Sequence, residues 1–113
     1  MKTLTLKDWD CPYESPEEIQ VESHKELTDI VNHWMTGKPD GRIFVCFDTW
    51  VMPDSDHTVN FNVTTVRERI GAYLQECRYN MIQFPNHKIK FNIYEFVIWE
   101  EAFIFCSDLQ EEL

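Results

Sequence analysis

The spacing of apolar residues changes several times along this chain, and these changes constrain the fold more than any other feature. Two segments carry apolar side chains at helical spacing, whereas the segments around them alternate apolar and polar residues as strands do. The first helical segment begins with a Ser-x-x-Glu capping box at Ser23 and places Ile30, Val31 and Trp34 on one stripe. It predicts a helix over about 24–36.

The second helical segment has the same signature. Thr65 and Glu68 form another capping box, and Ile70 and Tyr73 follow at helical spacing. We therefore expect a second helix over about 66–80.

Strand-like segments account for most of the remaining residues. In the clearest one, Val59, Phe61 and Val63 share one face while Asn60 and Asn62 lie on the other, which indicates a half-buried strand. A weak helix-start signal precedes residue 18, but the alternation that follows it favours a strand. Strands are expected near residues 3–6, 18–22, 42–49, 57–63, 88–99 and 102–106.

The segment from residue 88 onward changes parity part-way along. Ile89, Phe91 and Ile93 share one side, whereas Phe96 and Ile98 continue from the other. A β-bulge near residue 94 explains the change, and so does burial of the strand on both faces. Both explanations are compatible with the sequence.

The order of these elements predicts an α+β fold. We expect a mostly antiparallel sheet of about 4–6 strands with both helices on one face. The chain has 113 residues, enough for a single core. Residues 1–113 are therefore expected to form one domain, with a short acidic tail over about 108–113.

Negative charge is concentrated at both ends of the chain. The formal net charge is −10, and residues 8–29 hold eight carboxylates against one base, Lys25. Residues 91–113 hold six carboxylates and no Lys or Arg. Such segregation raises the local potential and steers a basic partner, whereas solubility alone does not require it. The arginines of the second helix, Arg67, Arg69 and Arg78, are the expected internal counter-charges.

Aromatic side chains lie within or beside both acidic ends. Acidic groups around aromatic anchors are typical of a surface that binds a basic, partly apolar partner. Trp50 is a separate candidate, because it begins an expected apolar loop between two strands. The residues expected to contact the partner are Asp8, Trp9, Asp10, Tyr13, Glu14, Glu17, Glu18, Glu22, Trp50, Trp99, Glu100, Glu101 and Asp108.

Several function classes are disfavoured. Lys and Arg are too few and too scattered for direct binding of nucleic acid, and no P-loop or GxGxxG motif is present. The four cysteines lack the close spacing of a zinc site, so we expect reduced and mostly buried thiols. No catalytic residue, metal site or cofactor is assigned. No apolar run approaches the length of a membrane span, and no secretory signal precedes the first strand.

One cluster supports an enzymatic alternative. Asp54, Asp56 and His57 offer ligands for a divalent ion near Asp48, as a metal-assisted hydrolase would require. A polar turn between two strands is the preferred interpretation of these residues.

These features predict a small cytoplasmic, non-enzymatic binding protein that inhibits a basic, nucleic-acid-handling protein. Its carboxylates would take the place of phosphates, and its aromatic rings the place of bases. Small acidic immunity proteins against toxin nucleases, and phage-encoded inhibitors of host defence enzymes, share this general character, although no motif places the chain in a named family. The remaining alternative is a structural or adaptor subunit that forms a homodimer through an edge strand at about 88–99.

Overall fold

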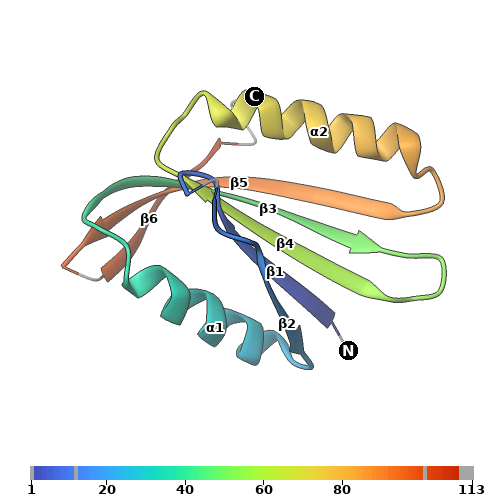
Figure 1. Cartoon of the computed structure of the whole chain (residues 1–113), viewed down its shortest axis with the longest axis horizontal. Coiled ribbons are helices and arrows are strands. Elements are labelled where there is room, and N and C mark those ends of the chain that lie inside the picture. The colour runs from blue at the N-terminus through green and yellow to red at the C-terminus, as the bar shows by residue number, and fades with distance from the viewer. Residues whose placement is uncertain (1, 12, 101, 110–113) are drawn as a thin grey trace.

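The computed structural model describes residues 2–11, 13–100 and 102–109, with residues 102, 103, 107 and 108 described by their backbone alone. The described residues form six strands and two helices, and each helix follows a pair of strands along the chain (Figure 1). Their bounds are β1 Lys2–Asp8, β2 Glu17–Val21, α1 His24–Thr36, β3 Gly41–Val51, β4 His57–Thr64, α2 Arg69–Gln83, β5 Lys88–Trp99 and β6 Ala102–Asp108.

The strands form one sheet in the order β2-β1-β4-β3-β5-β6. Three hairpin connections, β1–β2, β3–β4 and β5–β6, give antiparallel pairs, and β3 also pairs antiparallel with β5. Among the described strands, β1 and β4 form the one parallel pair. The expected α+β fold with a mostly antiparallel sheet is confirmed.

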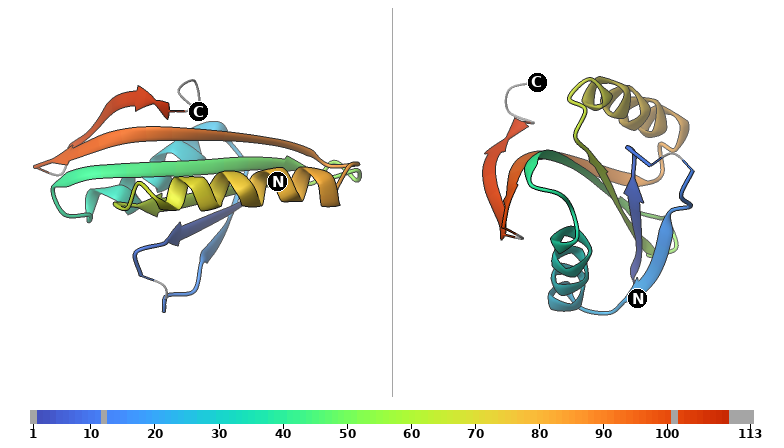
Figure 2. Two further views of the ribbon diagram at one scale, coloured as in Figure 1. Left: turned by 90° about the horizontal axis from the view of Figure 1, so that it is seen from above. Right: turned by 60° about the vertical axis from the view of Figure 1, so that its left-hand side comes forward.

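The two helices cover opposite faces of this sheet, so the prediction that both lie on one face is wrong (Figures 1 and 2). Strand β3 explains why. Its residues Phe44 and Cys46 pack with α2, whereas Ile43 and Val45 pack with Met35 of α1. Because successive side chains of a strand point to opposite faces, an uninterrupted apolar run such as 43–47 needs cover on both.

Burial on both faces also explains the parity change in β5. Phe91 and Ile93 pack with α2, whereas Phe96 and Ile98 pack on the α1 side. The register of β5 against β3 runs without interruption from Gly41 to the end of β3. An irregularity between Glu95 and Phe96 occurs only in the pairing of β5 with β6. The irregularity therefore shifts the register between β5 and β6, and it does not determine to which face the side chains of β5 point.

Helix α1 has the predicted bounds. The side chain of Ser23 accepts a hydrogen bond from the Glu26 backbone N–H at 3.1 Å, and the Glu26 side chain accepts one from the Glu22 backbone N–H at 3.2 Å. These contacts satisfy backbone donors that a helix start leaves without partners. Local sequence alone therefore determines where α1 begins.

Helix α2 begins three residues later than the sequence indicated, at Arg69 instead of residue 66. The expected capping box does not form, because the backbone N–H and hydroxyl of Thr65 both donate to Asp10, each at 2.8 Å. Asp10 lies far away in the sequence, in the β1–β2 connection. Its contact leaves Glu68 at the helix start without a side-chain capping bond.

The edges of the sheet are β2 and β6. Strand β5 pairs with β3 along its length but with β6 only from Tyr94 to Trp99, so its first half, residues 88–93, has a strand partner on one side only in the described part of the chain. The homodimer alternative stays a prediction. At the C-terminus, Asp108 is the last residue of β6 and Leu109 is buried in the core under α2, so the expected acidic tail does not start at residue 108. Residues 110–113 of that tail lie outside the described residues.

Candidate functional site

An apolar groove lies between the edge strand β2 and helix α1. Its floor consists of Leu6, Ile19, Ile30 and Trp34, and its volume is about 360 Å³. The alternation of β2 places Ile19 on the side that faces α1, and the helical stripe of α1 supplies Ile30 and Trp34. The groove therefore results from two local patterns in the sequence, the strand alternation before residue 23 and the helical apolar stripe after it.

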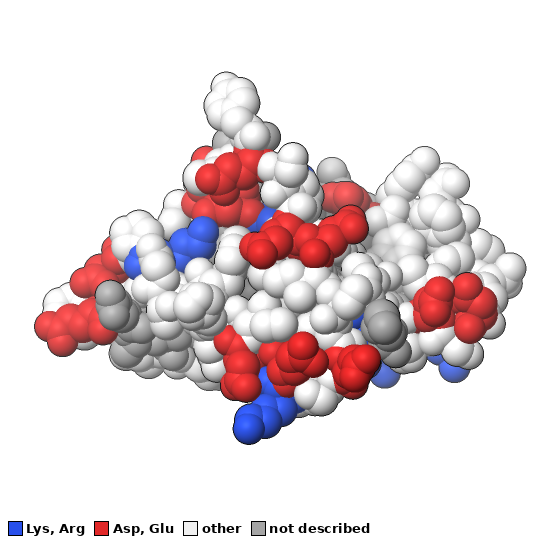
Figure 3. Space-filling model, turned by 60° about the horizontal axis from the view of Figure 1, so that its bottom comes forward, with Lys and Arg blue, Asp and Glu red and all other residues white. Residues whose placement is uncertain are grey.

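Carboxylates flank this groove from both walls. Glu17 of β2 and Asp29 of α1 contribute to its lining. Figure 3 shows two groups of carboxylates on this face with uncharged surface between them. Within the described part of the chain none of these side chains forms an ion pair, and Lys25 is the one Lys or Arg between residues 14 and 36. The exposed carboxylates of this region are Glu14, Glu17, Glu18, Glu22, Glu26 and Asp29.

The first two acidic residues have internal roles instead. Asp8 is 12% exposed and forms an ion pair with Lys38 at 2.6 Å. Asp10 accepts hydrogen bonds from Thr64 and Thr65. Its partial burial raises its pKa, but the hydrogen bonds from Thr65 and Thr64 outweigh this effect, and the pKa falls below the ordinary value. Asp8 is therefore mostly buried in an internal ion pair, whereas Asp10 is exposed and also holds Thr64 and Thr65.

The expected counter-charges differ from those observed. Lys38 pairs with Asp8 and Arg42 pairs with Glu95 at 2.8 Å. Neither Arg67 nor Arg78 forms an ion pair within the described part of the chain, and Arg69 acts on Asp10 only as the smallest contribution to its lowered pKa. The carboxylates near the groove therefore keep their charge uncompensated by α2.

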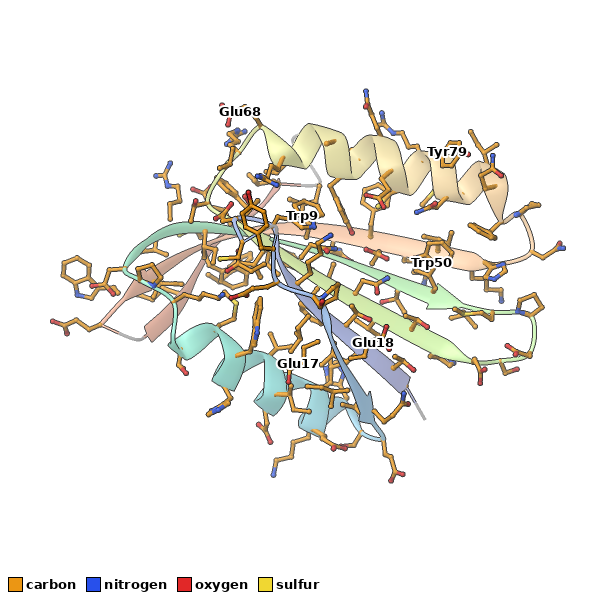
Figure 4. The ribbon with its side chains drawn as sticks, viewed as in Figure 1. Trp9, Glu17, Glu18, Trp50, Glu68 and Tyr79 are labelled. Carbon is orange, nitrogen blue, oxygen red and sulfur yellow. The ribbon has the colours of Figure 1, made fainter. Side chains whose placement is uncertain are left out.

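The four aromatic candidates separate into two pairs. Tyr13 is fully exposed and Trp99 is 60% exposed, so both are available for contact. Trp9 packs against Tyr73 with ring centroids 5.5 Å apart. Trp50 belongs to β3 and not to a loop tip, and its ring lies against Phe84. Trp9 and Trp50 both lie under α2, on the face opposite the groove (Figure 4).

The described part of the C-terminal acidic end, up to residue 109, does not adjoin the groove. The tip of the β5–β6 hairpin lies at one end of the molecule, well away from β2 in both Figure 1 and Figure 2. Glu100 is exposed, and its backbone N–H donates to Asp40 at 3.0 Å. The prediction for Glu101 falls outside the described residues, and Asp108 is placed by its backbone in β6.

A second site, which the sequence did not indicate, lies between α2 and the sheet. Asp48 is only 7% exposed there and accepts three hydrogen bonds. The donors are the Trp50 indole N–H at 2.7 Å, the Asn60 side-chain amide at 2.7 Å and the Tyr73 hydroxyl at 3.0 Å. Burial, followed by the nearby Asp48 charge, raises the pKa of Tyr73, which keeps its proton for this bond.

These groups line a cavity of about 270 Å³. The face of β4 that carries Asn60 and Asn62 was expected to meet solvent, but it forms the floor of this cavity beneath α2. The available signal was Asp48 itself, a carboxylate that directly follows the apolar run 43–47. A buried carboxylate needs hydrogen-bond donors, and Asn60 on the neighbouring strand β4 supplies one of them.

The cysteines do not provide a nucleophile in this cavity. Cys46 and Cys77 are buried and free, as expected of reduced thiols. Burial raises the pKa of Cys46 to about 12 and that of Cys77 to about 11. Cys11 and Cys106 are exposed, so only half of the thiols are buried, and the Asp8 charge raises the pKa of Cys11.

The residues of the enzymatic alternative lie in a turn. The side chain of Asp54 accepts a hydrogen bond from the Asp56 backbone N–H at 3.2 Å, as turn aspartates do. Asp48 is in β3, hydrogen-bonded to the donors named above. Within residues 2–11, 13–100 and 102–109, no three His, Cys, Asp or Glu side chains gather closely enough to hold a metal ion.

Comparisons with protein-family models, with curated proteins and with solved structures give no match for this chain. Neither helix in the described part of the chain is long and apolar enough to cross a membrane. The functional argument therefore depends on the geometry of the two sites.

Proposed function

We propose that this protein is a non-enzymatic inhibitor that captures a basic, partly apolar segment of a nucleic-acid-handling protein in the groove between β2 and α1. The observation that carries the proposal is the combination of an apolar floor with exposed, unpaired carboxylates on both walls. An apolar floor provides affinity through buried area, and the carboxylates favour a cationic partner and accelerate its association.

The chemistry of the groove matches the partner class. A protein that handles nucleic acid presents Lys and Arg side chains to phosphates and apolar or aromatic surface to bases. Glu17 and Asp29 would meet the cationic groups, while Ile19 and Trp34 would meet the apolar ones. Occupation of such a surface by this protein would exclude nucleic acid from it, and the partner's activity would fall.

The edge strand adds a second means of attachment. Strand β2 pairs with β1 on one side only, so its other side presents backbone groups without strand partners. An extended basic segment that pairs with β2 would place alternate side chains over the groove. Lys and Arg at those positions would lie close to Glu17.

The test compares two double charge reversals with the same net charge. Glu17→Lys with Asp29→Lys alters both walls of the groove, whereas Asp56→Lys with Glu68→Lys alters exposed carboxylates elsewhere. Each protein is used for affinity capture from its native cell at low salt, and the captured proteins are identified by mass spectrometry. Association rates are then measured with the purified partner over a salt series.

We expect the wild type and the Asp56/Glu68 variant to capture the same basic protein and to lower its nucleic-acid-handling activity. The Glu17/Asp29 variant should associate about tenfold more slowly at low salt, with the difference shrinking as salt screens the charges. Capture of a partner without a basic surface, or equal loss in both variants, would contradict the proposal.

A further inference from the structure

A second binding site lies on the opposite face of the sheet, in the cavity under α2. We infer that this cavity binds a monovalent organic cation, a guanidinium group, which it holds against Asp48 between Trp9 and Trp50. The inference does not depend on the proposed function, because no residue of this cavity belongs to the groove between β2 and α1.

The first argument is the buried charge of Asp48. This carboxylate is 7% exposed, and all three of its hydrogen-bond donors are neutral groups. Within the described part of the chain it forms no ion pair. Buried charges in proteins are normally paired, because desolvation of an isolated ion is unfavourable. A cationic ligand in the adjoining cavity would supply the missing partner.

The second argument is the charge balance of the cavity wall. Besides Asp48, the charged groups that line it are Glu76 on α2 and Lys7 on β1. One ammonium group against two carboxylates leaves a net charge of −1. A ligand with a single positive charge would neutralise the site, whereas an anion would add to the excess.

The third argument is the shape and chemistry of the remaining wall. Trp9 and Trp50 line the cavity, and both lie between α2 and the sheet (Figure 4). Asn62 and Asn80 also line it, and neither side chain makes a hydrogen bond within the described part of the chain. A guanidinium ion is planar, weakly hydrated and rich in N–H donors, so it stacks on indole rings while it donates to carboxylate and amide oxygens.

The arrangement of the wall is set by backbone periodicity. Tyr73, Glu76, Cys77 and Asn80 follow the helical i, i+3, i+4, i+7 spacing along one face of α2. The facing strands contribute alternate residues, among them Thr5 and Lys7 of β1, and Trp9 follows directly after that strand. These elements are held rigidly by the core beneath α2, so the site exists before any ligand arrives.

The test is a titration of the full chain, followed by the indole N–H signals of Trp9 and Trp50 in nuclear magnetic resonance spectra. Trp50→Phe identifies the Trp50 signal, which reports directly on the hydrogen bond to Asp48. The probes are N-acetyl-arginine methylamide, its neutral isostere N-acetyl-citrulline methylamide, and the monovalent small molecule ethylguanidinium. Comparison of the capped arginine with ethylguanidinium distinguishes an arginine side chain of a protein from a free small molecule as the natural source.

We expect saturable shifts with a guanidinium probe at a Kd of about 1 mM or tighter, and none with citrulline. Glu76→Gln should weaken binding about tenfold, because it removes one of two attracting charges, and Asp48→Asn should weaken it further. Lys7→Gln should tighten binding, because it removes the one like charge. The matched control Glu17→Gln, on the opposite face, should leave the Kd unchanged.

The opposite signs for Lys7 and Glu76 separate a cation site from general destabilisation. Glu76 is exposed and Lys7 is partly buried, and thermal melting checks that the variants keep the fold. Equal binding of citrulline, weaker binding in Lys7→Gln, or the absence of any saturable shift with both guanidinium probes would overturn the inference.

Discussion

The groove between β2 and α1 and the cavity under α2 use carboxylates in opposite ways. In the groove, the carboxylates are exposed and unpaired around an apolar floor. In the cavity, Asp48 is buried and receives three hydrogen bonds. Water solvates the groove carboxylates, so they need no hydrogen-bond partners from the protein. Asp48 is shielded from water and depends on protein donors. The same residue type is therefore dispensable for folding on one face and essential to it on the other.

The strongest test of this contrast is Asp48→Ala. We expect the variant to lose about 3 kcal/mol of unfolding free energy, because Tyr73, Trp50 and Asn60 would each keep a donor without its acceptor. Urea denaturation measures the loss. Glu17→Ala is the control and should change stability by no more than about 0.5 kcal/mol. Similar losses in the two variants would remove the distinction between the faces.

A second change tests the groove floor against its wall. Trp34 is partly buried and packs with both apolar clusters on the α1 side, and the Lys38 ammonium nitrogen lies 4.3 Å from its ring centroid. Trp34→Ala should therefore lower the unfolding free energy by about 2 kcal/mol. The same denaturation measurement applies. A neutral result would show that the floor is not part of the folding core.

Asp10 is intermediate between these two kinds of carboxylate, because it is exposed and yet hydrogen-bonded. We expect its contribution to the unfolding free energy to be smaller than those of Asp48 and Trp34. Because its pKa lies below the ordinary value of 3.8, the folded protein binds its proton less tightly than the unfolded chain. Its stabilising contribution is present above that value and disappears as the pH falls through the lower pKa of the folded state. Asp10→Asn should flatten the decline in stability below about pH 4, by less than about 1 kcal/mol.

The measurement for Asp10 is urea denaturation at a series of pH values. Glu14→Asn, which changes an exposed carboxylate nearby, is the control and should follow the wild type. An unchanged slope in Asp10→Asn would show that the bonds to Thr64 and Thr65 do not stabilise the fold.

The smallest expected effect on stability concerns the groove wall itself. Asp29→Ala should alter the unfolding free energy by less than about 0.5 kcal/mol, since its carboxylate is exposed and without an ion pair in the described part of the chain. A larger loss would indicate that the wall contributes to the fold and is not reserved for a partner.

Local patterns were sufficient for part of the fold. The bounds of α1 follow from Ser23 and an apolar stripe, and β4 follows from its alternation, because these signals come from neighbouring residues. The start of α2 could not be predicted in the same way, since Asp10 takes the donors of Thr65 across the β1–β4 pair. Long-range contacts of this kind have no local signature.

The cavity was missed for a related reason. Asn60 and Asn62 alternate with apolar residues as outward-facing side chains do, and only the position of α2 covers them. The sequence indicated two helices and a half-buried sheet, and such a sheet is compatible with both helices on one face. The unbroken apolar run of β3 indicates instead that this strand is buried on both faces. Burial on both faces requires one helix on each face of the sheet.

The parallel pairing of β1 with β4 affects the order in which the chain matures during synthesis. Lys2 pairs with His57, so β1 has no place beside β4 until the middle of the chain has been synthesised. The β3–β4 hairpin joins neighbouring segments and closes a much shorter loop. The N-terminal hairpin then completes both sites at once, because it contributes Ile19 to the groove and Lys7 to the cavity. A nascent chain thus forms neither the groove nor the cavity before its β1–β2 unit docks.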